Sequence, residues 1–349
     1  MASGSRARAA VGNDGVSGGS IPIKKGLEVY RPRPRLLSWK VPAFCCNDWV
    51  AIRLLQMCRA IGVAMPYGLV YGAPRCRWSG GRPSAVIEEL ADEQLQAYFE
   101  AYADYGVRVA LTLSRLSVDR PDYADAYCNR ILRVAKEYGA QIILCDDGLA
   151  DYIRGIHPDL RLVCSLNRPM CDFKDGFGGM DEVEYYRHML GRYDEVVIRC
   201  EFAQDDEGLA SLADVSGRCE VIVNQFCVPD CKNVYQHVSC MEDWDGSAEA
   251  RPCFSLARAA DIRYRLSESL FFSNTRINEF AAQGFTKMKL AGRNAPMPRF
   301  LDMIADYIFE PTGVISLLRG EISRQYRMES SRFIRGIAPF SLPGPMRLA

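Results

Sequence analysis

The 349-residue chain has no excess of either charge and no long apolar run. Its 43 basic side chains balance 43 acidic ones, whereas nucleic-acid-binding domains more often carry a basic excess. No segment approaches the roughly 18 consecutive apolar residues of a membrane span. The first 20 residues also lack the apolar core of a secretory signal peptide. We therefore expect a cytoplasmic protein that enters no membrane, and the net charge does not indicate nucleic acid as a partner.

Several catalytic motifs are absent as well. The chain has no P-loop, no HExxH zinc motif and no C-x3-C-x2-C radical-SAM triplet. Its three histidines, His157, His188 and His237, form no sequential pair with a serine or cysteine nucleophile. The sequence therefore carries none of these motifs, and a histidine and a nucleophile that the fold brings together stay open as an alternative.

Cysteine, in contrast, is abundant, with 14 residues in the chain. Four of them follow the apolar run 220–226 closely: Cys227, Cys231, Cys240 and Cys253. Thiolates are soft ligands that suit zinc or an iron–sulfur cluster. A structural zinc site usually shows two short C-x2-C knuckles, whereas here only the first pair is close. The irregular gaps favour a 4Fe–4S cluster. A zinc site and ordinary buried cysteines that only fill space remain the alternatives.

Eight short strand-like runs alternate with segments of helical periodicity. The runs are residues 40–46, 67–71, 107–113, 141–145, 161–166, 195–202, 220–226 and 286–290. Such alternation indicates parallel strands, and eight units can close into a TIM-type (β/α)8 barrel. An open, doubly wound sheet usually has a glycine-rich loop after its first strand. Here residues 44–49 contain no glycine, which favours the barrel.

Three regions are predicted along the chain. Residues 1–25 are glycine-rich and of low complexity, which is typical of a disordered leader. Residues 26–310 should form the barrel, with the cysteine segment 227–253 as an insert. Residues 311–349 should form a short C-terminal helical extension.

Polar side chains cluster where the predicted strands end. In α/β barrels the active site lies at the carboxyl ends of the strands, and the polar residues there are Asn47, Ser114, Asp146, Ser165, Glu201 and Asn224. We take Asp146, Glu201 and Asn224 as candidate catalytic residues. If Asp146 and Glu201 lie near each other or near a desolvated cluster, one of them can act as a general acid. For any single polar residue in these positions the alternative role is a helix N-cap.

Three segments resemble the collagenase-like peptidase family, U-32. Residues 221–231 are similar to its strand-plus-cysteine signature, and residues 271–293, which end in Lys-Leu-Ala-Gly-Arg, are similar to its closing motif. The stretch 141–165 resembles its strand, short helix, proline and strand unit. In the family pattern an acidic or small residue precedes the first cysteine. The chain departs from this pattern, because it has Gln225 and Phe226 there.

The resemblance implies a barrel of parallel strands. Several family members hold a 4Fe–4S cluster on four cysteines and take part in oxygen-independent hydroxylation, while the peptidase label applies to few. Carried over by position, it implies Cys227, Cys231 and Cys240 as ligands, with Cys253 as the fourth.

The sequence thus leads to one main functional hypothesis. The chain is expected to be an iron–sulfur oxidoreductase of the hydroxylase type, or an accessory to one, acting on a small molecule or a nucleic-acid base. Its partners would be a small-molecule substrate or electron donor, and a partner protein of the same family. The alternatives are a non-catalytic barrel with a structural zinc site on the four cysteines and a collagenase-like peptidase.

Overall fold

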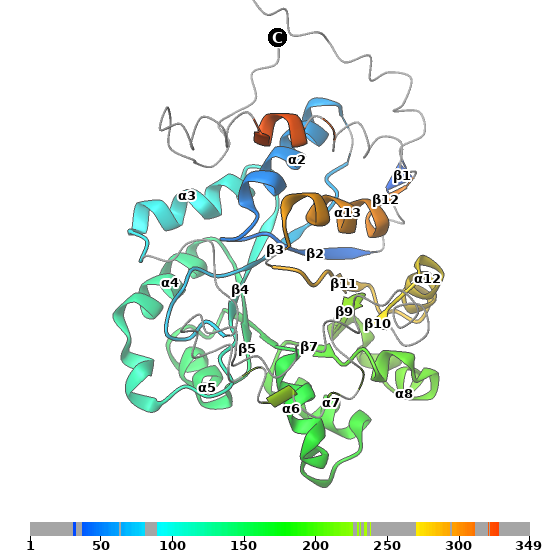
Figure 1. The fold of residues 1–349 in the computed structure, drawn as a ribbon. Helices are drawn as coiled ribbons and strands as arrows, with labels where there is room; N and C mark the ends of the chain where they lie inside the picture. Colours follow the sequence, from blue (N-terminus) through cyan, green and yellow to red (C-terminus); the bar gives the residue numbers. More distant parts are fainter. Residues whose placement is uncertain are drawn as a thin grey trace, which may run out of the picture.

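Eight parallel strands close into a barrel with helices outside it, as the sequence predicts (Figure 1). The computed structural model describes residues 31–32, 37–62, 64–80, 89–225, 229, 231, 234–235, 238, 270–293, 295–310, 320 and 322–327. Around the barrel the strands follow the order β11, β2, β3, β4, β5, β6, β7, β8, and β8 pairs with β11 to close the ring. Apart from this closing position of β11, neighbouring strands are consecutive in the chain, which is the connectivity of a (β/α)8 barrel.

The barrel strands are short. They are β2 (Ser38–Pro42), β3 (Leu69–Gly72), β4 (Arg108–Leu113), β5 (Gln141–Leu144), β6 (Arg161–Cys164), β7 (Glu195–Ile198), β8 (Cys219–Ile222) and β11 (Lys287–Lys289). Two small antiparallel pairs lie outside the ring: β1 (Arg31–Pro32) with β12 (Phe309–Glu310), and β9 (Asn224–Gln225) with β10 (Leu270–Phe271).

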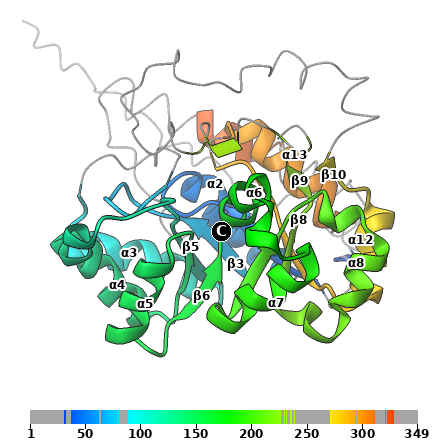
Figure 2. The same ribbon diagram turned by 90° about the horizontal axis from the view of Figure 1, so that it is seen from below.

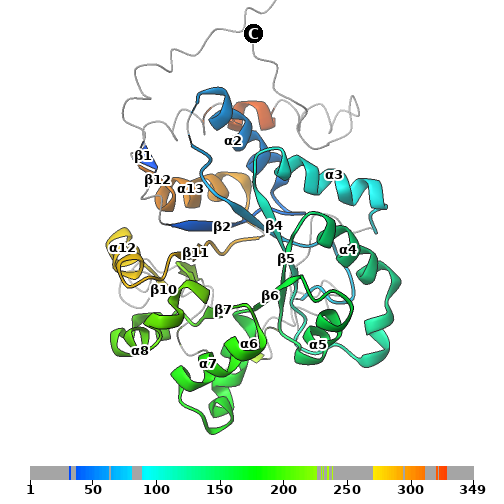
Figure 3. The same ribbon diagram turned by 180° about the vertical axis from the view of Figure 1, so that it is seen from behind.

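Helical segments follow each barrel strand and surround the ring, as the reverse view also shows (Figure 3). The α-helices are α2 (Asp48–Ala60), α3 (Asp92–Ala103), α4 (Ala126–Glu137), α5 (Asp147–Ile156), α6 (Asn167–Lys174), α7 (Glu182–Arg192), α8 (Asp206–Ser211), α12 (Asn274–Ala282) and α13 (Met297–Tyr307). The 3-10 segments are η1 (Arg120–Ala124), η2 (Gly176–Gly179), η3 (Phe202–Gln204) and η4 (Ala213–Arg218). Seen from the side, α6, β9 and β10 lie at the same end of the barrel (Figure 2).

The apolar core lies between the strands and the helices. Helix side chains such as Leu54, Phe99, Ile131 and Phe280 are at most 1% exposed against the outer faces of the strands. The centre of the barrel is different, because Lys40, Glu220 and Lys289 are buried there. Burial of charged groups requires close partners, so these three side chains constrain how the ring is assembled.

Strand positions are as predicted, but several strands end earlier. The first predicted run continues to residue 46, whereas β2 ends at Pro42 and the chain turns at Cys45, which has a positive φ of 58°. The run 195–202 ends at Ile198, because the backbone then enters η3. The run 220–226 divides into β8 and β9, and β9 leaves the ring to pair with β10. Strand ends therefore depend on where the ladder stops, which apolar content alone does not show.

The predicted outer regions fall largely outside the described residues. The leader 1–25 lies wholly outside them, as do residues 311–319 and 328–349. Residues 320 and 322–327 are helical, and the Tyr326 ring packs edge-on against Trp49 of α2, with ring centroids 5.3 Å apart. None of the helices in the described part has the length and apolar character needed to cross a bilayer.

Candidate functional site at the barrel mouth

Asn224 at the mouth of β8 is used to hold the backbone. Its Nδ2 donates to the carbonyl of Ala291 at 3.2 Å, and its Oδ1 accepts the N–H of Ala291 at 2.6 Å. The side chain is fully buried. Asn224 therefore fixes the segment after β11 by a two-point amide contact, which commits the side chain of this predicted catalytic residue to the backbone.

Asp146 caps helix α5. Its Oδ1 accepts the N–H of Leu149 at 2.6 Å and the hydroxyl of Tyr123 at 3.2 Å, and its Oδ2 accepts the N–H of Val118 at 3.3 Å. An N-cap carboxylate satisfies helix N–H groups that have no partner within the helix. These contacts account for the position of Asp146 on the β4–β5 side of the mouth.

Three other predicted mouth residues are either bonded to the surrounding loops or buried. Asn47 donates through Nδ2 to the carbonyls of Pro42 and Arg293, both at 3.2 Å. Ser114 is 2% exposed, and Ser165 is buried with its Oγ 3.4 Å from the N–H of Asn167. The polar mouth is thus real, but much of it joins the loops to one another.

The Lys-Leu-Ala-Gly-Arg segment after β11 spans this mouth. Arg293 donates through Nη1 to Thr112 Oγ1 at 2.7 Å on β4, and through Nη2 to the carbonyl of Gly80 at 3.5 Å. The carbonyl of Leu290 accepts the hydroxyl of Tyr71 at 2.7 Å. The segment that carries the family resemblance therefore connects β11 with β3 and β4 across the barrel.

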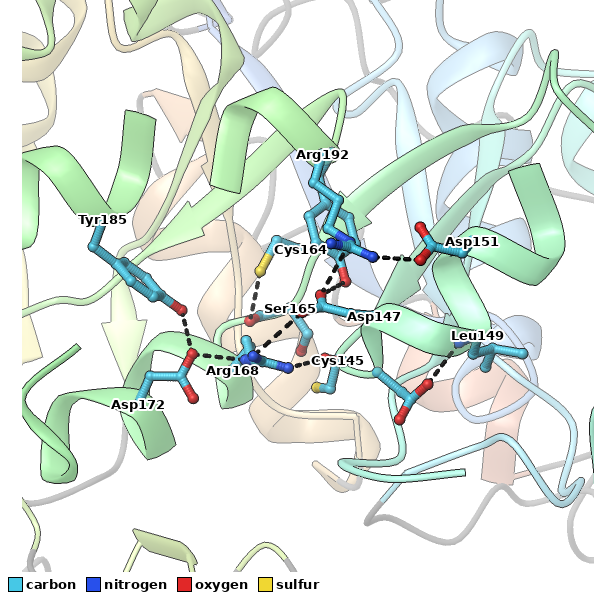
Figure 4. Close-up of polar contacts among 12 residues, drawn as sticks. Cys145, Asp147, Leu149, Asp151, Cys164, Ser165, Arg168, Asp172, Tyr185 and Arg192 are labelled. Atoms are coloured by element: carbon cyan, nitrogen blue, oxygen red, sulfur yellow. Dashed lines mark hydrogen bonds and ion pairs between the residues drawn. The ribbon is translucent and has the colours of Figure 1, made fainter. Parts of the chain in front are cut away.

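Arg168 organises the ends of β5 and β6 (Figure 4). Its Nε donates to Asp172 at 2.6 Å, its Nη2 lies 3.4 Å from Asp147, and its Nη1 donates to the carbonyl of Cys145 at 3.1 Å. The Tyr185 hydroxyl donates to the same Asp172 at 2.8 Å. This network ties α5, α6 and α7 together, and it satisfies the Arg168 guanidinium on several sides.

A pocket remains open on the β7 side of the mouth. Its volume is about 290 Å³. Helix α6 and the end of β7 supply most of the wall, and the short described piece around residue 234 closes it. The lining residues are Met170, Phe173, Lys174, Arg199, Glu201, Cys231 and Val234. Glu201 is thus the predicted catalytic residue that the structure places in a cavity.

Arg199 is the central charge of this pocket. Its side chain is 3% exposed and lies between two carboxylates, 3.2 Å from Glu182 and 3.7 Å from Glu201. Its guanidinium carbon also lies 3.5 Å from the centroid of the Phe173 ring. Burial raises the pKa of Glu182, and the Arg199 charge opposes that rise. The arrangement holds one guanidinium rigidly below an aromatic ring at the pocket wall.

Of the four predicted ligands, the structure describes one. Cys231 is half-buried and lines the pocket. Cys227, Cys240 and Cys253 lie outside the described residues, as does His237. Within the described residues, no three His, Cys, Asp or Glu side chains form a group that could hold a metal ion. The convergence of the four thiols therefore stays a prediction.

Of the residues that line this pocket, the sequence identified Glu201 and Cys231 but not the helical wall. Arg199 and Glu201 follow a recognisable strand. Glu182 on α7 and Phe173 on α6 reach them by tertiary packing, and neither residue stands in a motif. A polar residue in a helix gives no sign of its partner when that partner is 17 positions away.

Comparisons with known proteins add one structural likeness. No protein-family model matches the chain, and a search of curated proteins finds no match. Among solved structures, the chain is similar to the structure of the U32 peptidase Mk0906, with a TM-score of 0.45 and 11% identity, over 73% of this chain and 92% of that chain. The barrel is established by the closed order of its own strands.

Proposed function

We propose that the chain is an iron–sulfur barrel protein whose pocket beside Cys231 serves a redox reaction, as a hydroxylase-type enzyme or as an accessory to one. The ligands would be Cys227, Cys231, Cys240 and Cys253. The observation that carries the proposal is the position of Cys231. Its side chain lines a charged pocket at the carboxyl ends of the strands, which is the catalytic face of such barrels.

The residues around Cys231 fit a thiolate-bound cluster. Four thiolates bring negative charge, and Lys174 and Arg199 supply positive charge in the same pocket. Met170, Phe173 and Val234 provide apolar wall, which lowers the local dielectric and tunes a redox centre. When bound, such a cluster would supply one-electron transfer.

The chain's own polar groups suit a small substrate with an anionic or carbonyl oxygen. The Arg199 guanidinium is fixed by Glu182 and stacked on Phe173, so it is pre-organised to bind such an oxygen. Glu201 lies in the same pocket, 3.7 Å from Arg199, and is the carboxylate best placed to take or give a proton. A pre-organised charge of this kind acts without reorganisation during a reaction.

Metal analysis of the full chain tests the proposal. Protein purified without oxygen should contain iron and acid-labile sulfide and should be brown, and dithionite should bleach it reversibly. Cys231→Ser should lose most of the iron. Cys46→Ser is the matched control: Cys46 is also half-buried near the mouth, and its thiol donates only to the carbonyl of Pro42 at 3.7 Å, a contact that a hydroxyl can keep. It should retain the iron of the wild type.

Each other result has a definite meaning. Zinc in place of iron and sulfide would establish the structural zinc site on the four cysteines and remove the redox function. Equal metal content in Cys231→Ser and the wild type would remove Cys231 as a ligand. A chain that binds no metal under any condition would leave the cysteines as packing residues.

A further inference from the structure

A second cavity lies at the amino-terminal end of the barrel, opposite the mouth. Its volume is about 60 Å³. The first residues of seven of the eight barrel strands line it, and the other lining residues, Lys40 and Glu220, also belong to barrel strands. The cavity is therefore built by the ring itself, on rigid elements, and it is separate from the cysteine pocket.

Positive charge is in excess around this cavity. Its lining contains four cationic side chains and two carboxylates: Lys40, Arg108, Arg161 and Lys287, with Glu195 and Glu220. Lys289 adds a further buried cation, 3.4 Å from Glu220. Two carboxylates cannot neutralise these cations, and buried charge is costly unless it is compensated. The cavity therefore favours an anion.

One carboxylate oxygen takes several of the donors. Glu195 Oε1 lies 2.7 Å from Lys287 Nζ and 2.8 Å from Arg161 Nη2, and it accepts a hydrogen bond from Gln141 Nε2 at 3.2 Å. An ammonium has three N–H groups and a guanidinium has five. Lys287 and Arg161 thus have further N–H groups that this single oxygen does not use.

Gln141 also requires a hydrogen-bond donor in the cavity. Its side chain is 3% exposed, and its Nε2 must face Glu195 because an ionised carboxylate only accepts hydrogen bonds. The other end of the amide, Oε1, is buried and has no hydrogen-bond partner among the described residues. An unpaired buried acceptor costs about 1–3 kcal/mol, so an O–H group at this point would be stabilising.

We propose that this cavity binds one small oxyanion that keeps a proton at pH 7, namely hydrogen phosphate or bicarbonate. The negative oxygens of the anion accept from Lys40, Lys287 and Arg161, and its O–H donates to Gln141 Oε1. The volume admits about four to six water-sized groups at roughly 10–15 Å³ each, which suits an inorganic oxyanion and excludes a sugar or nucleotide phosphate. Bound there, the anion stabilises the ring and takes no part in a reaction at the mouth.

Sulfate is the discriminating probe. It resembles phosphate in shape and charge, but at pH 7 it has no proton, so it would leave Gln141 Oε1 unpaired. A site that hydrogen-bonds a ligand O–H rejects an analogue that lacks this group. Phosphate or bicarbonate should therefore bind at least about tenfold more tightly than sulfate.

Thermal unfolding of the full chain tests the site. The protein is held at pH 7 in a degassed buffer of constant ionic strength set by chloride, and low millimolar phosphate, bicarbonate or sulfate is added. A ligand that binds the native state raises Tm in a saturable manner. We expect phosphate or bicarbonate to raise Tm by about 2–4 °C, and the one that acts at the lower concentration is the ligand.

Two variants locate the binding site. Arg108→Met removes a lining cation whose side chain is exposed, so the chain should fold and bind the anion about 2–5-fold more weakly. Gln141→Met removes the acceptor and should abolish the preference over sulfate. Arg133→Met is the control for the loss of one positive charge, because Arg133 is 59% exposed on α4 and pairs with Asp92 at 2.6 Å. It should leave the Tm shift unchanged.

Three results would overturn the proposal. Equal shifts from phosphate and sulfate in the wild type would show that Gln141 does not select the ligand. A shift that persists unchanged in Arg108→Met would place the anion elsewhere on the protein; this variant decides the point if Gln141→Met fails to fold. The absence of a saturable shift from all three anions would leave water as the content of the cavity.

Discussion

Two groups of buried charge in the described barrel, one at its centre and one at its mouth, differ in what surrounds them. In the middle of the barrel, Glu220 lies 2.5 Å from Lys40 and 3.4 Å from Lys289, and all three side chains are buried. Lys40 and Glu220 line a cavity of only about 60 Å³. At the mouth, Arg199 lies between Glu182 and Glu201, beside the pocket of about 290 Å³. The central charges border only this small cavity, whereas the charges at the mouth border the larger pocket.

The origin of the partners explains this difference. Lys40, Lys289 and Glu220 come from β2, β11 and β8, three successive strands of the ring, so closure of the barrel brings their side chains together. Arg199 receives Glu182 from α7 and Phe173 from α6, and these helices leave a hollow above it. Charges matched between strands act on stability, whereas charges matched between a strand and its covering helices leave room for a ligand. The predictions below separate these two roles.

Glu220→Gln should have the largest effect on stability. It leaves Lys40 and Lys289 buried without a carboxylate, and removing one partner of a buried ion pair costs about 3–5 kcal/mol. Urea unfolding at pH 7 measures the loss. Since the variant can fail to fold, Glu220→Gln combined with Lys289→Met gives a second measurement, because it removes one of the two uncompensated charges. We expect the double variant to be more stable than the single one.

The mouth supplies the control for this first prediction. Glu201→Gln makes the same change from carboxylate to amide beside an open pocket. It should lower the free energy of unfolding by less than about 1 kcal/mol, as for a partly solvated pair. It should instead alter substrate turnover. Equal losses in Glu220→Gln and Glu201→Gln would contradict the distinction between the two sites.

Arg199→Met should have the next largest effect, and one that depends on pH. Without the guanidinium, two half-buried carboxylates face each other unpaired, at a cost of about 2–3 kcal/mol at pH 8. The pKa of Glu182, already raised by burial, should rise further. A raised folded pKa means that stability falls as pH rises through it. The loss of stability relative to wild type should therefore become smaller as the pH falls from 8 to 5. Thermal unfolding at both pH values measures it.

Arg168→Met is the matched variant for this measurement. Arg168 also bridges two carboxylates, Asp172 at 2.6 Å and Asp147 at 3.4 Å, but its side chain is 28% exposed. Solvent screens such pairs, so the loss should be about 1 kcal/mol and nearly independent of pH. A pH slope as steep as that of Arg199→Met would remove burial as the explanation.

The fold followed from the sequence because it depends on local periodicity. Alternating strand and helix runs predict the barrel, and each of the eight predicted runs contains or overlaps a strand of the ring. The site followed only in part. Asn224 and Glu201 look alike in the sequence, as polar residues after apolar runs. Their roles differ because the backbone of Ala291, 67 positions away, binds Asn224, whereas Glu201 lines the pocket. Contacts at such separation arise from the closed ring, and no local pattern encodes them.

Asp48→Asn should stabilise the protein at neutral and alkaline pH. Burial raises the pKa of Asp48 from 3.8 to about 7, although the Tyr102 hydroxyl donates to it at 2.8 Å. Because the folded pKa is raised, ionisation costs stability as pH rises from about 4 to 7. An amide avoids that cost and still accepts from Tyr102, so we expect a gain of about 1–2 kcal/mol at pH 8. At pH 4 the two proteins should unfold at the same denaturant concentration. A variant that is no more stable at pH 8 than at pH 4, relative to wild type, would falsify this prediction.

Lys289→Met should have the smallest effect, and it tests whether the central charges form a pair with one surplus lysine. Burial lowers the pKa of Lys289 from 10.5 to about 8, against the pull of Glu220, and the neighbouring Lys40 adds to the decrease. Between pH 8 and about 10.5 the unfolded chain binds more protons than the folded one, so stability from this group rises with pH in that window. Methionine removes the buried charge, and Lys40 and Glu220 remain as a neutral pair. The variant should therefore gain about 1 kcal/mol at pH 7, and the difference should vanish toward pH 10.

Lys287→Met is the control, since Lys287 is 24% exposed and lies 2.7 Å from Glu195; its small loss should not depend on pH. If Lys289→Met instead costs as much as Glu220→Gln, both lysines are required by the carboxylate, and the barrel centre is a matched triad in which no charge is in surplus.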